Sequence, residues 1–97
     1  MKRYLVVIEK GMNNYSAYSP DVLGCVTVGE TVEETKVNMT EALGGHLSLM
    51  LEDGEALPEP KNYASYLQAV QDSKGADWYL CEIEIDEHHL QNKRVAA

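Results

Sequence analysis

Hydrophobic positions in the first third of the chain are spaced as in short β-strands. A nearly continuous apolar run covers residues 4–9, which predicts a central strand buried on both faces. Shorter aromatic and β-branched segments follow at residues 15–18 and 25–28. A turn at residues 11–14 and an irregular stretch at residues 19–24 separate them. We therefore expect three strands with tight connections, as in an antiparallel meander.

After residue 30 the apolar spacing becomes helical. Thr31 and Glu34 have the spacing of a capping box, in which each side chain reaches the other's backbone N–H. Asp53-Gly54 and Pro58 are typical of a helix end. The positions between them that share one helix face, and that we expect to be buried, are Thr35, Met39, Ala42, Leu43, His46, Leu47 and Met50.

Gly44-Gly45 lies in the middle of this predicted helix. Each glycine costs about 1 kcal/mol relative to alanine in a helix interior. One interpretation is that packing outweighs this cost and that the bare backbone allows close approach of the sheet or of a second subunit. The other is that the helix kinks or breaks here. The pattern favours the continuous helix.

The last third of the chain predicts a short helix and a fourth strand. Residues 62–70 read as a helix, and its packed side would carry Tyr63, Tyr66, Leu67 and Val70. A turn at residues 72–75 follows. Residues 78–85 alternate as a half-buried strand, and residues 87–97 predict no element. On this strand Tyr79, Cys81, Ile83 and Ile85 share one face, and Glu82 and Glu84 the other.

The order strand-strand-strand-helix-(helix)-strand predicts an α+β domain of two layers. We expect a small sheet with the strand order 3-2-1-4, numbered along the chain, and the long helix across one face. Strands before and after a crossover helix tend to lie parallel, so the expected sheet is mixed.

Composition narrows the possible functions. Ninety-seven residues form one domain, and an apolar share of 44% excludes intrinsic disorder. The net charge of −8 opposes binding to nucleic acid and favours a basic partner. The N-terminal apolar run is too short for a secretory signal, and no segment approaches the roughly 20 apolar residues of a membrane span. We expect a cytoplasmic protein in which Cys25 and Cys81 are reduced.

No motif for catalysis, cofactor binding or metal binding stands out. The acidic residues Glu9, Asp21, Asp53 and Asp86 have no spacing that indicates a metal site. Residues 86–89 carry two carboxylates and two imidazoles, but adjacent residues seldom converge on one ion. His46 lies on the apolar helix face without a nucleophile that can be tied to it. We expect no catalytic residue, no cofactor and no metal.

One block of the chain resembles the HicB family of antitoxins. The family pattern P-D-x-x-G-C-x-T-x-G-x-T-x-E-E-A matches residues 20–35, and D-G-x-x-x-P-x-P matches residues 53–60. Asn38 and Glu41-Ala42-Leu43 fit the family between these blocks. The chain departs from the pattern at Thr35, which replaces the usual alanine, and at the unusual Gly44-Gly45. The resemblance covers residues 4 to about 86.

The resemblance implies a partial ribonuclease-H-like fold without a nuclease site. It further implies an antitoxin of a type II toxin-antitoxin system that binds and occludes HicA, a small basic toxin that cleaves mRNA, and that self-associates as a dimer or tetramer. We assign residues 1–86 to the HicB-like domain. Residues 87–97 then form a tail, or the stub of the DNA-binding domain that family members often carry, and this chain alone should not bind DNA specifically.

Four carboxylates are candidates for the toxin interface, because an exposed acidic surface suits a basic partner. The ordinary alternative for each is a solvated surface charge. Two other functions stay open: an orphan HicB-fold domain that binds another ligand or protein, and a residual metal-dependent nuclease. The candidates are Asp21, Glu30, Glu82 and Glu84.

Overall fold

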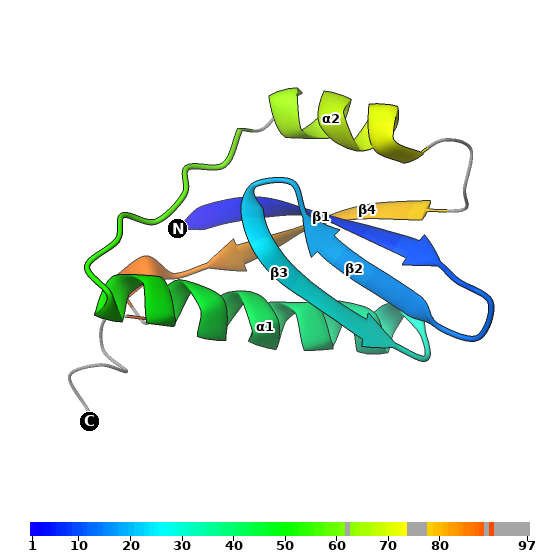
Figure 1. Ribbon diagram of the computed structural model, residues 1–97, viewed down its shortest axis with the longest axis horizontal. Coiled ribbons are helices and arrows are strands. Elements are labelled where there is room, and N and C mark those ends of the chain that lie inside the picture. The colour runs from blue at the N-terminus through cyan, green and yellow to red at the C-terminus, as the bar shows by residue number, and fades with distance from the viewer. Residues whose placement is uncertain (62, 74–77, 89, 91–97) are drawn as a thin grey trace.

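The computed structural model describes residues 1–61, 63–73, 78–88 and 90. They form a four-stranded sheet with α1 across one face and the shorter α2 against the other (Figure 1). The elements are β1 (Lys2–Lys10), β2 (Tyr15–Ser19), β3 (Val22–Gly29), α1 (Val32–Glu52), α2 (Tyr63–Ser73) and β4 (Trp78–Ile85).

The sheet has the predicted order, β3-β2-β1-β4, but every neighbouring pair is antiparallel. The predicted mixed sheet is therefore wrong. Between β3 and β4 the chain crosses the sheet twice, first along α1 and then back along residues 53–61 and α2 (Figure 1). A double crossing returns the chain to the end where β3 finished, so β4 runs opposite to β3.

The first three strands are longer than their apolar cores predict, whereas β4 has the predicted bounds. β1 and β2 are joined by the expected turn, in which Gly11 N donates to Asn14 O over 2.7 Å. β3 already begins at Val22, so the expected irregular stretch at residues 19–24 is reduced to a short turn. The positive φ of Gly24 (83°) and a register shift at Tyr18/Ser19 absorb the irregularity within the paired strands.

The main core lies between the sheet and α1. Val6, Val7 and Ile8 are consecutive and all buried, which confirms that β1 is a central strand covered on both faces. The helical spacing is confirmed as well, because Thr35, Met39, Leu43 and Leu47 of α1 are fully buried against the sheet.

Helix α1 begins at the predicted N-cap, where Thr31 Oγ1 accepts from Glu34 N over 3.0 Å. The return contact of the capping box falls one residue earlier than predicted, because Glu34 Oε1 accepts from Glu30 N. The helix runs unbroken through Gly44-Gly45. A Cβ at either glycine would meet no atom within 4 Å, so close approach of the sheet does not explain the pair.

Helix α2 is longer than predicted and packs differently. It continues to Ser73, into the expected turn, whose remaining residues 74 and 75 lie outside the described residues. Ala69 is its fully buried position. Tyr66, Leu67 and Val70, which we expected on the packed side, are 42–46% exposed, and the side chain of Tyr63 is not described.

The fold continues beyond β4. Leu90 is 3% exposed and belongs to the same hydrophobic core, although its sequence context predicted no element. Glu87 meets the N-terminal ammonium over 2.7 Å, which brings both ends of the described chain together. Within the described residues, no helix is both long and apolar enough to cross a bilayer.

Candidate partner-binding surface

The direction of the backbone groups on β4 follows from one hydrogen bond on β1. Leu5 N donates to Asp21 Oδ2 over 3.0 Å, on the side of β1 away from β4. Leu5 lies opposite Glu82 in the β1–β4 pair. Because the N–H of Leu5 points away from β4, the two residues exchange no backbone hydrogen bonds. In an antiparallel pair of this kind, the N–H and C=O of Glu82 point away from β1. Backbone direction repeats every second residue, so Leu80 and Glu84 also point outward. We call the outward groups of these three residues the open edge.

The same alternation identifies the outward groups of β3, the strand at the other end of the sheet. The backbone groups of Val7 point toward β2, where they bond with Tyr18. The groups of Tyr18 therefore point toward β1 and not toward Val26, its partner on β3. The backbone groups of Val26, and of Val28 two residues on, consequently point away from β2. The carbonyl of Val28 is occupied, since Asn38 Nδ2 on α1 donates to it over 2.9 Å. We call these outward groups the closed edge.

The approach of α1 to β3 is closest at Gly29. A Cβ at Gly29 would lie 2.4 Å from Thr35 Oγ1 and 2.8 Å from Thr35 N. Further along, His46 is the nearest side chain to a Cβ built on Gly24, at 3.9 Å. Helix α1 thus follows β3 along its length and supports this edge from within the same chain.

Two of the four predicted carboxylates lie on the open edge. Glu82 and Glu84 are exposed and project from the same face of β4, as the alternation predicted. The nearest described cation is Arg3, whose Nε lies 3.9 Å from Glu84 Oε2 with both side chains more than half exposed. Such a surface pair contributes little to stability, so both carboxylates remain accessible to a partner.

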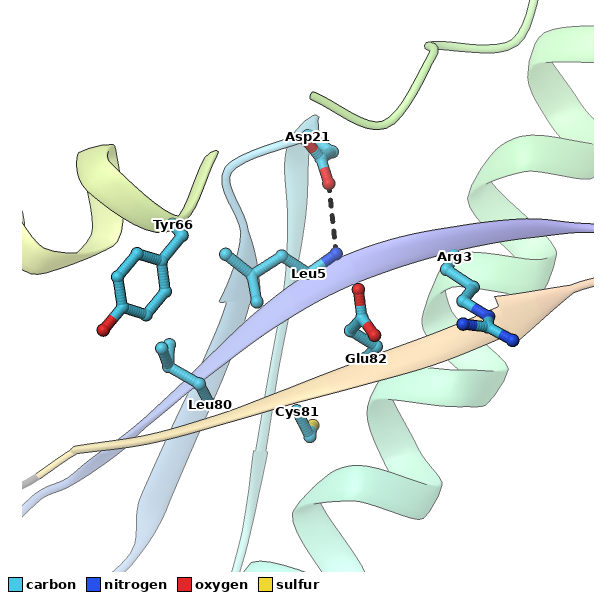
Figure 2. Close-up of a pocket in the computed structure, with 7 residues that line it drawn as sticks. All are labelled: Arg3, Leu5, Asp21, Tyr66, Leu80, Cys81 and Glu82. Carbon is cyan, nitrogen blue, oxygen red and sulfur yellow. Dashed lines mark hydrogen bonds between the residues drawn. The ribbon is translucent and has the colours of Figure 1, made fainter. Parts of the chain in front are cut away.

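A groove of about 580 Å³ runs beside these carboxylates, between α2 and the β1–β4 pair. Figure 2 shows Tyr66 of α2 facing Leu80 of β4, with Leu5 of β1 beside this pair and Glu82 further along β4. Arg3 lies further along β1. The groove joins an apolar floor to an acidic border next to the open edge.

Asp21 has a different environment from the other candidates. It is 7% exposed, and its two carboxylate oxygens accept from Leu5 N and Lys61 N, each over 3.0 Å. It therefore joins β1 to the segment after α1. Tyr4 strengthens the same connection by donating from its hydroxyl to Pro58 O over 2.8 Å. The contact of Asp21 with a partner stays a prediction, and burial of its carboxylate argues against it.

Glu30 is exposed, at the junction of β3 and α1. Its backbone N–H is bound by Glu34, and it is far along the sheet from the open edge. The structure thus brings Glu82 and Glu84 together on β4, places Asp21 with Glu82 in the lining of the same groove, and leaves Glu30 elsewhere. The sequence did not indicate Leu80 and Tyr66, because only the packing of α2 on this face of the sheet places them side by side.

Burial raises the pKa of three side chains outside the group of candidate carboxylates, those of Tyr4, Cys25 and Cys81. Burial, and then the negative charges of Glu59, Asp21 and Glu87, raise the pKa of Tyr4 to about 12. Both cysteines are free, and burial raises the pKa of the Cys25 and Cys81 thiols, with a smaller opposing effect of Lys36 on Cys81. Among the residues with described positions, no three His, Cys, Asp or Glu side chains are gathered as a metal site.

Solved structures define the class of this fold. The chain is similar to one in the "HicA3 and HicB3 toxin-antitoxin complex", with 29% identity, a TM-score of 0.69, and coverage of 87% of this chain and 98% of that one. It is also similar to the N-terminal domain of the Burkholderia pseudomallei antitoxin HicB, with 26% identity, a TM-score of 0.66, and coverage of 86% and 99%. The fold is that of the HicB antitoxins.

Sequence comparison gives the family. The chain belongs to the HicB-like antitoxins of bacterial toxin-antitoxin systems, whose family profile matches residues 4–97. This confirms the resemblance to the HicB family. A 14.9 kDa protein of Haemophilus phage HP1 is 33% identical over 90 residues, which are 93% of this chain and 65% of that protein. A UPF0150 protein of Helicobacter pylori is 39% identical over 56 residues, 58% of this chain and 78% of that protein.

Proposed function

We propose that this chain binds and occludes a small, basic, mRNA-cleaving toxin of the HicA type, without chemistry of its own, in the cytoplasm. The observation that carries the proposal is the exposed pair Glu82 and Glu84 on the open edge of a HicB-like antitoxin. A net charge of −8 supports a basic partner, because opposite charges accelerate encounter and favour one partner over others. The similarity to a chain of a HicA–HicB complex supports the kind of toxin.

The carboxylates differ in how well they suit a contact. Glu82 and Glu84 are accessible and adjacent on one face, so a basic surface can meet both at once. Asp21 is already bound on both oxygens, and we give it a structural role. Glu30 is exposed but isolated from the groove, and we place it outside the interface.

The test is co-purification with a small basic HicA-type toxin, at low and at raised salt. We expect a stable complex that weakens with salt, since exposed charges are screened within about 10 Å at 0.1 M. The variant Glu82→Lys/Glu84→Lys should slow association by tenfold or more, a direct consequence of reversed steering.

The matched control is Glu52→Lys/Glu55→Lys. Both residues are exposed, and the charge change is the same. If both double variants lose the same factor in association rate, only the net charge matters, and Glu82 and Glu84 do not lie in the toxin interface. Absence of a complex for the unmodified chain at any salt would contradict the toxin-binding function and favour an orphan binding domain.

We further propose that the chain self-associates and that it does not bind operator DNA specifically on its own. The acidic composition supports the second statement, because phosphate contacts require cations. Sedimentation gives the oligomeric state. A mobility shift with operator DNA that survives excess competitor DNA would contradict the second statement.

A further inference from the structure

We propose that the toxin adds a β-strand to the open edge of β4, so that the sheet continues from antitoxin into toxin. This inference rests on the proposed function and specifies how the partner binds. The strand it requires is basic, with Lys or Arg at alternate positions opposite Glu82 and Glu84.

The open edge presents backbone groups in the right arrangement. The N–H and C=O of Leu80, Glu82 and Glu84 point away from β1, and no strand covers them among the described residues. Natural sheets protect such edges with charged side chains, proline, bulges or a covering helix. The charges of Glu82 and Glu84 on β4 act against a like-charged copy but not against a basic strand. β4 contains neither proline nor lysine, and its register with β1 has no shift over its whole length. It is therefore a regular template for strand addition.

The other end of the sheet shows what protection looks like in this fold. There α1 follows β3, Asn38 occupies the carbonyl of Val28, and Gly29 allows the first turn of the helix to touch the strand. The same helix does not protect β4, because it packs mainly against β3 and β2.

The charges on the open edge select its occupant. Glu82 and Glu84 are on residues whose backbone groups point outward, so their side chains border any strand that pairs there. A second copy of this chain would add its own two carboxylates to the same seam, and like charges across strands are destabilising. A basic strand instead gains opposite-charge pairs along the backbone bonds.

The groove gives the added strand an apolar contact. Leu80 belongs to the open edge and also faces Tyr66 across the groove. A side chain of the toxin strand on this face would pack between them, next to the acidic border. Backbone bonds, alternate charges and one apolar contact together define the recognition.

The experiment removes one outward backbone donor without changing charge. Proline at position 80 removes an N–H that is not used within the sheet, and edge strands accept proline at such positions. Leu80→Pro should weaken binding of the purified HicA-type toxin roughly tenfold more than Leu80→Ala, which loses the same side chain but keeps the N–H. The matched control is Val26→Pro against Val26→Ala on the closed edge, which should bind the toxin equally.

The outcomes separate the two proposals. If the unmodified chain forms no complex, the proposed function fails. If it binds the toxin and Leu80→Pro binds as well as Leu80→Ala, the function stands and strand addition is overturned. If Leu80→Pro does not fold, amide hydrogen exchange of the unmodified chain decides. The Glu82 and Glu84 amides must then exchange about 100-fold more slowly at a free toxin concentration near 100 times Kd, and unchanged rates overturn the proposal.

Discussion

The two outer strands of the sheet differ in what the chain does with their free sides. β3 is followed by α1, which binds the carbonyl of Val28 through Asn38 and touches Gly29 at its first turn. β4 has no such cover within the described chain and carries two exposed carboxylates instead. Under the proposed function, the two ends of one sheet differ in role: β3 is supported by the chain's own helix, and β4 is the edge we assign to the partner.

The residue types at each edge reflect this division. The closed edge uses a glycine for close approach and an amide for a backbone bond, and both act within the chain. The open edge uses charge, which discourages pairing between identical copies and favours a partner of opposite sign. Changes at the closed edge should therefore reduce stability, and changes at the open edge should reduce binding.

The largest loss of folding stability, and so the sharpest test of the closed edge, should come from Gly29→Ala. The added Cβ would lie less than 3 Å from both backbone and side-chain atoms of Thr35, so α1 must move away from β3. Overpacking typically costs 1–3 kcal/mol, and the rigid backbone contact places this variant at about 3 kcal/mol. Chemical denaturation measures the loss. A loss below about 1 kcal/mol would show that α1 does not hold the closed edge.

The next effect should come from Asp21→Ala, which tests whether this carboxylate is structural. The change removes the acceptor from two part-buried hydrogen bonds, those of Leu5 N–H and Lys61 N–H, at about 2 kcal/mol in total. Urea unfolding gives the value, and Asp21→Asn should lose less because one acceptor oxygen remains. An Asp21→Ala variant that keeps its stability but binds the toxin more weakly would show instead that Asp21 contacts the toxin.

Tyr4→Phe should cost about 1 kcal/mol at neutral pH, because Pro58 O loses its donor. Tyr4 has a folded pKa near 12, above its ordinary value of 10.0. Its neutral form therefore stabilises the fold below pH 10, and that contribution is lost as the pH rises toward 12. The free energy of unfolding should fall by up to about 3 kcal/mol more in the unmodified chain than in Tyr4→Phe over this interval. Parallel curves for the two proteins would contradict the burial of the Tyr4 hydroxyl.

The smallest stability effect should come from Asn38→Ala, at about 0.5 kcal/mol, because the hydrogen bond that it removes is exposed. Its interest lies in what it exposes, since the carbonyl of Val28 would become available next to the exposed Val26 and Val28 side chains. We expect increased self-association at high concentration, measured by sedimentation, with toxin affinity unchanged. Reduced toxin affinity would place the partner on the closed edge.

Sequence reasoning predicted most of the fold because the apolar spacing is local information. The strand order, the position of α1 and its continuity through Gly44-Gly45 are confirmed. The strand direction was wrong because it depends on how often the chain crosses the sheet between Gly29 and Trp78, which spacing does not encode. The predicted packed side of α2 was wrong for a similar reason, since Ala69 is fully buried whereas the larger Leu67 and Val70 are exposed.

The candidate site was only partly predictable. Alternation along β4 correctly placed Glu82 and Glu84 on one exposed face. It could not show that their backbone groups point outward, because that follows from the bond between Leu5 and Asp21, which are 16 residues apart. For the same reason the sequence suggested Asp21 as a surface charge, whereas the fold buries it as a connection between β1 and Lys61.

The most direct test compares the amides of both edges in one hydrogen-exchange experiment, with and without the HicA-type toxin. The account predicts that the amides of Leu80, Glu82 and Glu84 exchange quickly in the free chain and become protected in the complex. The Val26 amide on the closed edge should be unaffected by the toxin. A complex in which β4 keeps its fast exchange, or in which β3 gains the protection instead, would contradict the account.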